Sequence, residues 1–309
     1  MPWPTHTDDS PDQAGNQSLP VEVIIVNYNS TTELLACLAS VYRVLGPGVR
    51  VLVEDNDSTD QAAPARERFP QAAWHLNARN LGFGRAVNRA LARCRQPYQI
   101  LLNPDAVLLD QDYGLIVRHL AEHPRIAALG PRILDPGGQV QGSARAFHTP
   151  LTALFGRKSP LTRWFPHNSL TRRNLLTLNS DGVTPQTVDW LSGACLWVRR
   201  EAWRQVGGLD ERFFMYFEDT DWCRRFWEAG WEVVYFPAVS VVHQVGASSK
   251  ASLRPVWEFH RSCWLYLRKY HFAAKPWSAL PATAALGGLF LTQAAHTMLK
   301  GCLRSRAAR

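Results

Sequence analysis

The amino-terminal part of the chain alternates apolar runs with a helical pattern, and this alternation constrains the fold more than any other feature. Residues 21–26 are apolar and β-branched, residues 31–45 carry apolar side chains at helical spacing, and residues 49–53 are apolar again. Short apolar runs bounded by turn residues are typical of buried strands, and two strands joined by a helix form a parallel βαβ unit. We therefore expect an α/β fold.

A polar turn follows the second apolar run, at residues 54–60, where the sequence is EDNDSTD. Ligands of open α/β sheets bind beyond the carboxyl ends of the strands, so this turn could accept hydrogen bonds from a base or a ribose. It could also begin a helix at Ser58 or Thr59, which are favourable N-cap residues. No Gly-x-Gly-x-x-Gly pattern follows the first strand, which argues against a nicotinamide-binding domain.

A tight loop at residues 80–85 (NLGFGR) leads into a helix that we expect over residues 86–94. It places Arg85 near a helix N-terminus, where backbone N–H groups and the helix dipole favour a phosphate. A loop shaped only by its glycines, with a solvated arginine, explains the same residues. Both interpretations stay open on local grounds.

A further apolar run, Tyr98–Leu102, ends in Asn103-Pro104-Asp105 before an apolar stretch resumes at residues 107–109. This pattern predicts a buried strand with Asp105 at its carboxyl end. A carboxylate there can hold Mg²⁺ or Mn²⁺, hard cations that take oxygen ligands and are shared with substrate phosphates. An ordinary Asn-Pro-Asp turn without a metal is the alternative.

The aromatic run at residues 213–217 leads directly into Glu218, Asp219 and Asp221. Apolar surroundings and a neighbouring carboxylate both raise the pKa of a carboxyl group, and a raised pKa suits a general base. The same acids could instead complement the dipole at the start of a helix that continues over residues 223–229 to a cap at Gly230. Both interpretations can hold together.

Six motifs of the chain occur in an order that points to one family of enzymes. They are Asn27-Tyr28-Asn29-Ser30, Glu54-Asp55-Asn56-Asp57-Ser58-Thr59-Asp60, Asn80-Leu81-Gly82-Phe83-Gly84, Asn103-Pro104-Asp105, Gly207-Gly208-Leu209-Asp210 and Phe217-Glu218-Asp219-Thr220-Asp221. The chain resembles the inverting glycosyltransferases of family two, in particular their bacterial rhamnosyltransferase-like branch. The resemblance covers about residues 20–272 and depends on the agreement of many separate motifs.

The resemblance implies a GT-A fold, in which a Rossmann-like mixed sheet is flanked by helices. One domain over residues 20–272 would bind a nucleotide-diphosphate sugar in its first half, about residues 20–110, and an acceptor in its second half, about residues 111–272. A C-terminal helical extension would follow. Asp55 would bind the nucleoside base, and Arg85 and Asn88 would lie near the donor. The donor-side residues that the resemblance suggests are Asn27, Asn29, Asp55, Asp57, Arg85, Asn88 and Asn103.

The resemblance also implies a divalent metal, Mn²⁺ or Mg²⁺. Asp105 would be the acid of the metal-binding Asp-x-Asp motif, whose first position is Asn103 in this chain. His243 follows the apolar run at residues 239–242, where relatives can supply a further metal ligand. Taken alone, a histidine at a strand end is an ordinary polar residue. A divalent cation and an arginine could stabilise the negative charge of a departing nucleoside diphosphate.

Asp219 would be the base that deprotonates the acceptor hydroxyl, with Glu218 and Asp221 orienting the site. A base opposite the leaving group gives inversion and needs no covalent nucleophile, which agrees with the lack of a Gly-x-Ser-x-Gly motif. The candidate reaction moves L-rhamnose from a thymidine-diphosphate donor to a surface polysaccharide or a lipid-linked glycan. A catalytically inert nucleotide-sugar-binding subunit of a polysaccharide assembly complex is the alternative. A nucleotidyltransferase is disfavoured, because residues 26–30 contain no glycine-rich, basic phosphate loop.

The carboxyl end of the chain is basic. The net charge is +8, and after Glu258 the chain contains eight Lys or Arg residues and no acid. Residues 278–299 are largely apolar but interrupted, so we expect residues 273–309 to form a basic amphipathic tail that binds the cytoplasmic face of the cell membrane. A packed helix with a solvated end is the alternative. Nucleic acid is not an expected partner, because no RNA-binding motif is present.

Other segments support weaker predictions. Residues 1–19 lack the basic and apolar segments of a signal peptide, so we expect a disordered lead-in. Six widely spaced cysteines predict neither a zinc site nor a disulfide framework, and reduced thiols fit a cytoplasmic protein. Residues 257–271 predict a helix that is either an acceptor-side wall or buried on one side. Residues 147–187 predict a mobile loop or lid.

Overall fold

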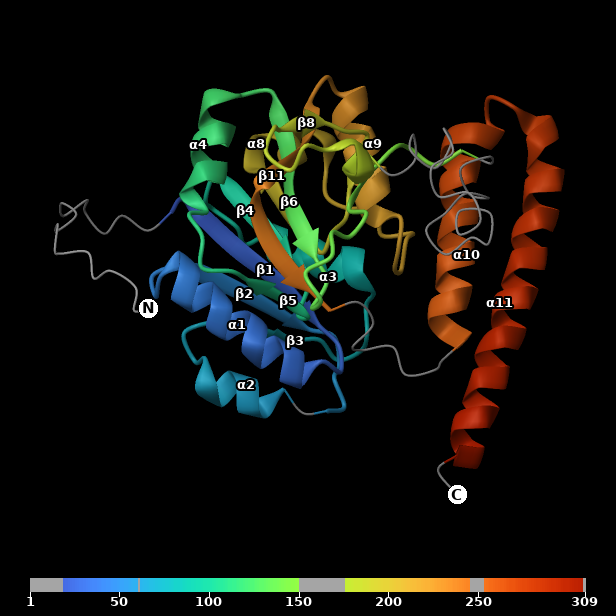
Figure 1. Ribbon diagram of the computed structural model, residues 1–309, viewed down its shortest axis with the longest axis horizontal. Coiled ribbons are helices and arrows are strands. Elements are labelled where there is room, and N and C mark those ends of the chain that lie inside the picture. The colour runs from blue at the N-terminus through green and yellow to red at the C-terminus, as the bar shows by residue number, and fades with distance from the viewer. Residues whose placement is uncertain (1–18, 61, 150–175, 245–252, 308–309) are drawn as a thin grey trace, which may run out of the picture.

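The computed structural model describes residues 19–60, 62–149, 176–244 and 253–307. This part of the chain forms a nine-stranded sheet with helices on both faces (Figure 1). The strand order is β3-β2-β1-β4-β10-β6-β11-β5, and β8 pairs with β11. The strands are β1 (Val21–Asn27), β2 (Arg50–Asp55), β3 (Ala73–Leu76), β4 (Tyr98–Leu102), β5 (Ala106–Leu108), β6 (Ile126–Leu134), β8 (Gln186–Thr187), β10 (Cys195–Arg199) and β11 (Glu232–His243).

The helices and the smaller elements complete the fold. The α-helices are α1 (Thr31–Leu45), α2 (Ala63–Arg68), α3 (Phe83–Leu91), α4 (Gly114–Glu122), α8 (Arg200–Val206), α9 (Glu218–Glu228), α10 (Leu253–Leu267) and α11 (Ala279–Ala307). The short helices are η1 (Leu176–Asn179), the π-helix η2 (Arg268–Phe272) and η3 (Pro276–Ser278). A separate antiparallel ribbon joins β7 (Ala144–Arg145) to β9 (Trp190–Leu191).

The directions of the strands bring several strand ends to one edge of the sheet. β1 is parallel to β2 and β4, and β2 is parallel to β3. β10 runs antiparallel between β4 and β6, while β11 is parallel to β6. The carboxyl ends of β1, β2, β4, β6 and β11 therefore lie at the same edge, where α/β sheets bind their ligands. β5 begins at that edge, because Ala106 pairs with His243 at the end of β11.

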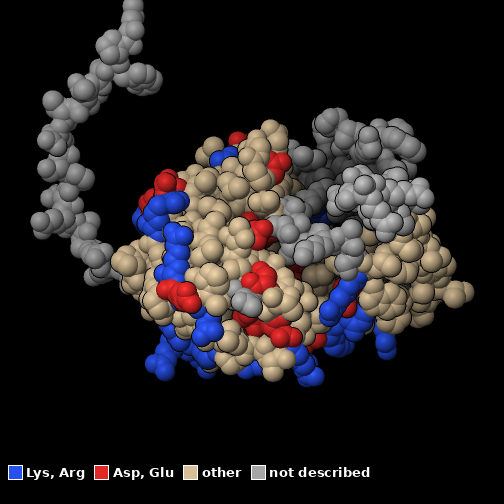
Figure 2. Space-filling view, turned by 90° about the horizontal axis from the view of Figure 1, so that it is seen from below, with Lys and Arg blue, Asp and Glu red and all other residues tan. Residues whose placement is uncertain are grey.

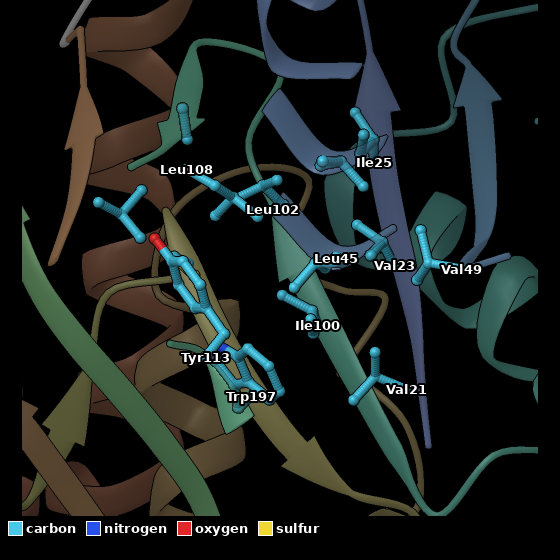
Figure 3. Close-up of a cluster of buried hydrophobic side chains, with 14 of the residues drawn as sticks. Val21, Val23, Ile25, Leu45, Val49, Ile100, Leu102, Leu108, Tyr113 and Trp197 are labelled. Atoms are coloured by element: carbon cyan, nitrogen blue, oxygen red, sulfur yellow. The ribbon is translucent and has the colours of Figure 1, made fainter. Parts of the chain in front are cut away.

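Each face of the sheet has its own apolar core, as the alternation of side chains along a strand requires. Val23 and Ile25 of β1 point to the side covered by α1 and α4, within the cluster drawn in Figure 3. Ile24 and Val26 point to the opposite side, where they pack with residues of α3 and α9. Full burial of each such side chain stabilises the fold by about 1.5–3 kcal/mol.

The two C-terminal helices lie side by side beside the sheet (Figure 1). A third apolar cluster joins α10 to the aromatic loop before α9 and includes Phe213, Phe217, Tyr266 and Leu286. The indole N–H of Trp264 on α10 donates to the Thr283 hydroxyl of α11 over 3.0 Å. The C-terminal extension is therefore helical and packed, and it is attached at the loop that carries the acidic motif.

The mixed α/β sheet that the sequence predicts is confirmed, and α1 and β4 have the expected bounds. Other bounds differ. The second strand continues to Asp55, and the next helix begins at Ala63 instead of Ser58 or Thr59, because the Ser58 hydroxyl donates to Asp55 instead of capping a helix. The helix expected over residues 86–94 is α3, which begins and ends three residues earlier, and the N–H of its first residue, Phe83, donates to Phe214 O.

Some predictions fall on residues whose structure is not described. The expected lead-in lies almost wholly within residues 1–18, and the expected lid includes residues 150–175. The helix expected over residues 257–271 is α10 followed by η2, and it is buried on one side. No helix in the described part of the chain is both long enough and apolar enough to cross a membrane.

Candidate active site

The carboxyl ends of β1 and β2 form a hydrogen-bonded polar node. The Asn27 amide donates to Asp55 Oδ1 (3.3 Å) and to the Ser58 hydroxyl (3.1 Å), and Ser58 donates to Asp55. Asn29 and Asp57 have left-handed φ angles of 53° and 65°, which Asn and Asp tolerate better than most residues. Asn27 is fully buried, and its Oδ1 finds no hydrogen-bond partner in the described residues. The node therefore contains one buried acceptor that is unpaired among the described residues.

The loop before α3 lies against the aromatic loop before α9. The Asn56 amide donates to Gly82 O over 3.2 Å, and the N–H of Phe83 donates to Phe214 O over 2.9 Å. A Cβ on Gly82 would lie 2.6 Å from Phe214 O, and the φ of Gly82 is +83°. Only glycine fits both the close approach and this backbone conformation. The donor-side motif and the acidic motif are thus in direct contact.

Arg85 and Asn88 of α3 contact the turn at residues 207–211. Arg85 Nε donates to Glu211 Oε2 over 2.8 Å, and both side chains are partly exposed. The Asn88 amide donates to Leu209 O (2.9 Å) and Glu211 Oε1 (3.2 Å), and its Oδ1 accepts from the N–H of Leu209 (2.8 Å). Through these three hydrogen bonds, the Asn88 side chain holds the turn against α3, and we call this contact the Asn88 brace. Contact of Arg85 and Asn88 with a donor stays a prediction.

Asp105 and His243, which are far apart in the sequence, meet at the edge of the sheet. His243 Nε2 lies 3.1 Å from Asp105 Oδ1 and 3.3 Å from Asn103 Nδ2. On its other side, His243 Nδ1 lies 3.4 Å from Gln141 Oε1, and Gln141 Nε2 donates to His243 O over 2.7 Å. A proton on Nδ1, shared with Gln141, would leave the Nε2 lone pair directed at Asp105 and Asn103.

This pair fits a divalent cation. If Nε2 carries no proton, this nitrogen and the Asp105 oxygen 3.1 Å away would direct two lone pairs at each other, and a cation between them would bind both. Adjacent ligands of an octahedral cation, each at about 2.1 Å, are about 3 Å apart. No group of three His, Cys, Asp or Glu residues suited to a metal occurs among the described residues. The remaining ligands would therefore come from donor phosphates and water.

Glu218 and Asp219 begin α9 and differ in their surroundings. Asp219 Oδ2 accepts from the N–H of Gly193 (3.0 Å), and its Oδ1 accepts from the N–H of Thr220 (2.7 Å). Burial raises the pKa of Asp219, and these hydrogen bonds oppose the rise. Glu218 is buried, and its Oε2 has no partner in the part of the chain described. Burial, and then the Asp219 charge, raise the pKa of Glu218 well above its usual value.

The turn that precedes Glu218 and Asp219 has a strained backbone. Tyr216 and Phe217 have φ angles of 70° and 69°, although neither is glycine. Such residues cost about 1–3 kcal/mol each, occur mainly at functional sites and persist only where the surrounding structure holds them. The aromatic run before Glu218 therefore forms a specific left-handed turn.

A single loop connects the two acidic motifs. Gly193 donates its N–H to Asp219, and the next residue, Ala194, accepts the Asn103 N–H at its carbonyl over 3.0 Å. The Asn103-Pro104-Asp105 motif and Asp219 are therefore held by adjacent residues. Sequence reasoning missed Gly193 and Ala194, because backbone groups contribute through position and leave no signal in residue type.

Asp221, which the resemblance suggests orients the site, is bound by residues of α9 and of the C-terminal extension. It is fully buried and accepts hydrogen bonds from Arg225 (2.8 Å), Lys269 (2.6 Å) and Tyr270 (2.8 Å). Its carboxylate is turned to the C-terminal extension. Sequence reasoning also missed Lys269 and Tyr270, which lie 48 and 49 residues away along the chain.

Comparison with known proteins identifies relatives of this chain. A model of glycosyl transferase family 2 matches residues 22–206. The N-acetylglucosaminyl-diphospho-decaprenol L-rhamnosyltransferase of Mycobacterium tuberculosis is 33% identical over 297 residues, which cover 91% of this chain and 94% of the relative. The rhamnosyltransferase WbbL of Escherichia coli is 25% identical over 197 residues, covering 61% of this chain and 70% of the relative.

Solved structures share the fold. GalNAc-T7 with UDP, GalNAc and Mn²⁺ has a TM-score of 0.59 at 15% identity, covering 85% of this chain and 51% of that one. The mannosyltransferase PcManGT from Pyrobaculum calidifontis, in complex with GDP-Man and Mn²⁺, has a TM-score of 0.54 at 19% identity, covering 99% of this chain and 84% of that one. The sheet is thus that of GT-A glycosyltransferases, and the chain belongs to glycosyl transferase family 2 as a rhamnosyltransferase-like glycosyltransferase.

Proposed function

We propose that this glycosyltransferase moves L-rhamnose, with inversion, from a nucleotide-diphosphate donor to a lipid-linked glycan. The observation that carries the proposal is the joining of the Asp105–His243 pair and Asp219 through one loop at the ligand edge of the sheet. Similarity to a rhamnosyltransferase over 91% of the chain supports the sugar. The name of that relative, which contains N-acetylglucosaminyl-diphospho-decaprenol, supports the acceptor class. Thymidine diphosphate is the candidate leaving group.

Asp219 is the proposed general base. Its carboxylate accepts the proton of the acceptor hydroxyl as that oxygen attacks the anomeric carbon from the side opposite the leaving group, which inverts the configuration. A pKa raised by burial brings the base closer to the operating pH, and the N–H groups of Gly193 and Thr220 hold the carboxylate in place. Glu218, the proposed orienting residue, is buried beside it, and burial and then the Asp219 charge raise its pKa well above its usual value.

Asp105 and His243 are the proposed metal ligands, with Asn103 beside them. A bound Mn²⁺ or Mg²⁺ supplies electrostatic stabilisation of the charge that develops on the departing diphosphate. Gln141 orients His243, a contact from outside the ligand set of the kind that fixes metal-binding imidazoles. The solved GT-A structures that contain Mn²⁺ support a requirement for a divalent metal.

The polar node at the ends of β1 and β2 is the proposed nucleoside site. Asp55 and Asn27, whose Oδ1 has no partner among the residues that the structure describes, would accept hydrogen bonds from the base or the ribose. Asn29 and Asp57 shape the loop through their left-handed backbones. Arg85 would have to exchange Glu211 for the donor diphosphate, because its guanidinium pairs with that carboxylate.

We also propose that the enzyme binds the cytoplasmic face of the membrane through α11. Leu280, Leu291 and Met298 are 82%, 67% and 54% exposed, and spacings of 11 and 7 residues place them in one stripe of the helix. Trp277, just before α11, is 76% exposed. The chain after Glu258 is wholly basic among its charged residues, and an anionic leaflet favours each nearby Lys or Arg by about 1 kcal/mol. A lipid-linked acceptor would be presented at that surface.

Nucleic acid is not a proposed partner. On the face shown in Figure 2, Lys and Arg side chains are interspersed with Asp and Glu. A nucleic-acid site is typically a basic patch or stripe. The distribution of charge on this face therefore gives no support to a nucleic-acid groove.

The test is nucleoside-diphosphate release from a panel of activated sugars, with a polyprenyl-diphospho-N-acetylglucosamine acceptor. The assay is run with and without Mn²⁺ or Mg²⁺, on wild type and on Asp105→Ala. We expect release from the L-rhamnose donor that needs both the metal and Asp105. Turnover of a different sugar would contradict the proposed donor. Nucleotide binding without turnover of any donor would favour the inert-subunit alternative.

A further inference from the structure

We propose that Lys269 and Tyr270 are positioning residues for sugar transfer. Through them, the segment formed by α10 and η2 holds the first turn of α9 in the conformation that presents Asp219. This inference rests on the proposed role of Asp219 as the base. It gives the C-terminal extension a part in catalysis in addition to the proposed membrane contact.

The direct connection is a buried carboxylate two residues beyond Asp219. Asp221 is fully buried, and its Oδ1 accepts hydrogen bonds from Lys269 Nζ (2.6 Å) and from the Tyr270 hydroxyl (2.8 Å). Its Oδ2 accepts from Arg225 Nε (2.8 Å) within α9. Arg225 alone could serve this carboxylate from its own helix. The two further donors both come from η2, so the acidic turn is tied to the C-terminal extension.

The helix geometry explains how two consecutive residues reach one oxygen atom. Successive side chains of an α-helix diverge by about 100°, so neighbours do not face the same atom easily. Lys269 and Tyr270 lie in the π-helix Arg268–Phe272, whose wider turn reduces that angle. Lys269 also donates to Asp210 over 2.9 Å, which adds the turn before the aromatic loop to the same network.

A second set of contacts lies on the strained turn itself. The Ser262 hydroxyl of α10 donates to Met215 O over 2.9 Å. The Phe217 ring has its centroid 5.6 Å from the rings of both Phe259 and Tyr266, which also belong to α10. Phe217 is one of the two left-handed residues of this turn, so α10 packs directly on the strained part of the backbone.

These contacts have a mechanistic consequence. Asp219 lies two residues after Phe217, which packs on α10, and two residues before Asp221, which binds η2, so contacts hold the chain on both sides of the base. If the contacts of Phe217 or of Asp221 were lost, the strained turn would relax and the Asp219 carboxylate would move. A displacement of about 1 Å in a reacting group can lower the rate about 100-fold.

The experiment compares four variants of the full chain. Lys269→Met removes the ammonium, and Tyr270→Phe removes one hydroxyl while keeping the ring. Lys269→Arg restores a cation that can reach Asp221. Arg204→Gln is the control, because it removes one positive charge from an exposed position of α8, away from this network. For each variant, kcat and the donor KM are measured, together with amide hydrogen exchange over residues 212–222 and over the sheet.

For Lys269→Met we expect kcat to fall about 100-fold with little change in donor KM. Exchange should become faster over residues 212–222 and stay unchanged in β1 and β4. Tyr270→Phe should show a smaller loss of the same kind, Lys269→Arg should recover most of kcat, and Arg204→Gln should match wild type.

Two results would overturn the inference: faster exchange at 212–222 with kcat unchanged, or faster exchange throughout the sheet, which would show a role in stability alone. If the wild-type enzyme transfers a sugar other than L-rhamnose, only the proposed donor is wrong. The kcat values of the variants are then measured with the sugar donor that the wild-type enzyme does use.

Discussion

At the scale of single residues, one oxygen of the Glu218 carboxyl group has no hydrogen-bond partner within the described ranges of the chain. Its pKa is raised in the folded protein, chiefly by burial and next by Asp219. The folded state therefore binds this proton more tightly than the unfolded state does. Binding of this proton by Glu218 stabilises the folded state fully at pH values below the unfolded pKa, near 4.5. The stabilisation is lost as the pH rises through the folded pKa. At neutral pH Glu218 destabilises the fold.

Glu218→Gln should raise the melting temperature at pH 7–8 by about 2 °C or more, because the neutral amide removes the buried acid. The gain should disappear near pH 4, where the carboxyl group is protonated in both states. Because Glu218 is the proposed orienting residue on the acceptor side of the site, the rate of sugar transfer should also fall in Glu218→Gln. Thermal unfolding at the two pH values measures the effect, and Glu67→Gln, at an exposed position, is the control. An equal gain at both pH values would contradict the titration argument.

At the scale of elements, the turn between α8 and the aromatic loop depends on close packing against α3. A Cβ on Gly208 would lie 2.2 Å from Asn88 Oδ1, an atom that the N–H of Leu209 holds in place. Gly208→Ala should therefore force the Asn88 brace apart and cost stability by the loss of about three hydrogen bonds, or about 2–4 kcal/mol.

The stability losses caused by Gly208→Ala and Asn88→Ala should be strongly non-additive. Asn88→Ala removes the clashing atom, so adding Gly208→Ala to that variant should cost much less than it does in the wild type. Urea unfolding of the two single variants and the double variant measures the interaction. Additive losses would show that the close approach does not determine the cost.

The same elements show how far the sequence predicts this molecule. Periodicity and β-branching predict α1 and β4 well, because apolar spacing reports directly which face of an element is buried. Strand direction then explains why Asp55 and Asp105 lie at one edge. The bonds of Asp219 to Gly193 and of Asp221 to Lys269 could not be predicted, because a backbone donor has no residue signature and pairing over 48 residues depends on the completed fold.

At the scale of the whole molecule, the sheet carries the proposed chemistry and the α10–α11 pair beside it carries an exposed apolar stripe. Leu280→Asp combined with Leu291→Asp should lower binding to vesicles that contain phosphatidylglycerol by at least about tenfold, because two apolar contacts become charges facing an anionic surface. Vesicle sedimentation measures the change. Val183→Asp is the matched control, since Val183 is 69% exposed on a different part of the surface. Equal binding by the double variant and the control would contradict the proposed membrane face.

The central claim is that Asp219 removes the proton of the acceptor while the rest of the edge binds the donor. The most direct measurement pairs two assays on Asp219→Asn: sugar transfer to the lipid-linked acceptor, and binding of thymidine diphosphate with Mn²⁺. A general base contributes about 10²–10⁴-fold, so we expect transfer to fall by at least about 100-fold with nucleotide affinity nearly unchanged. A proportionate loss of nucleotide affinity, or transfer within a few fold of wild type, would show that Asp219 is not the base.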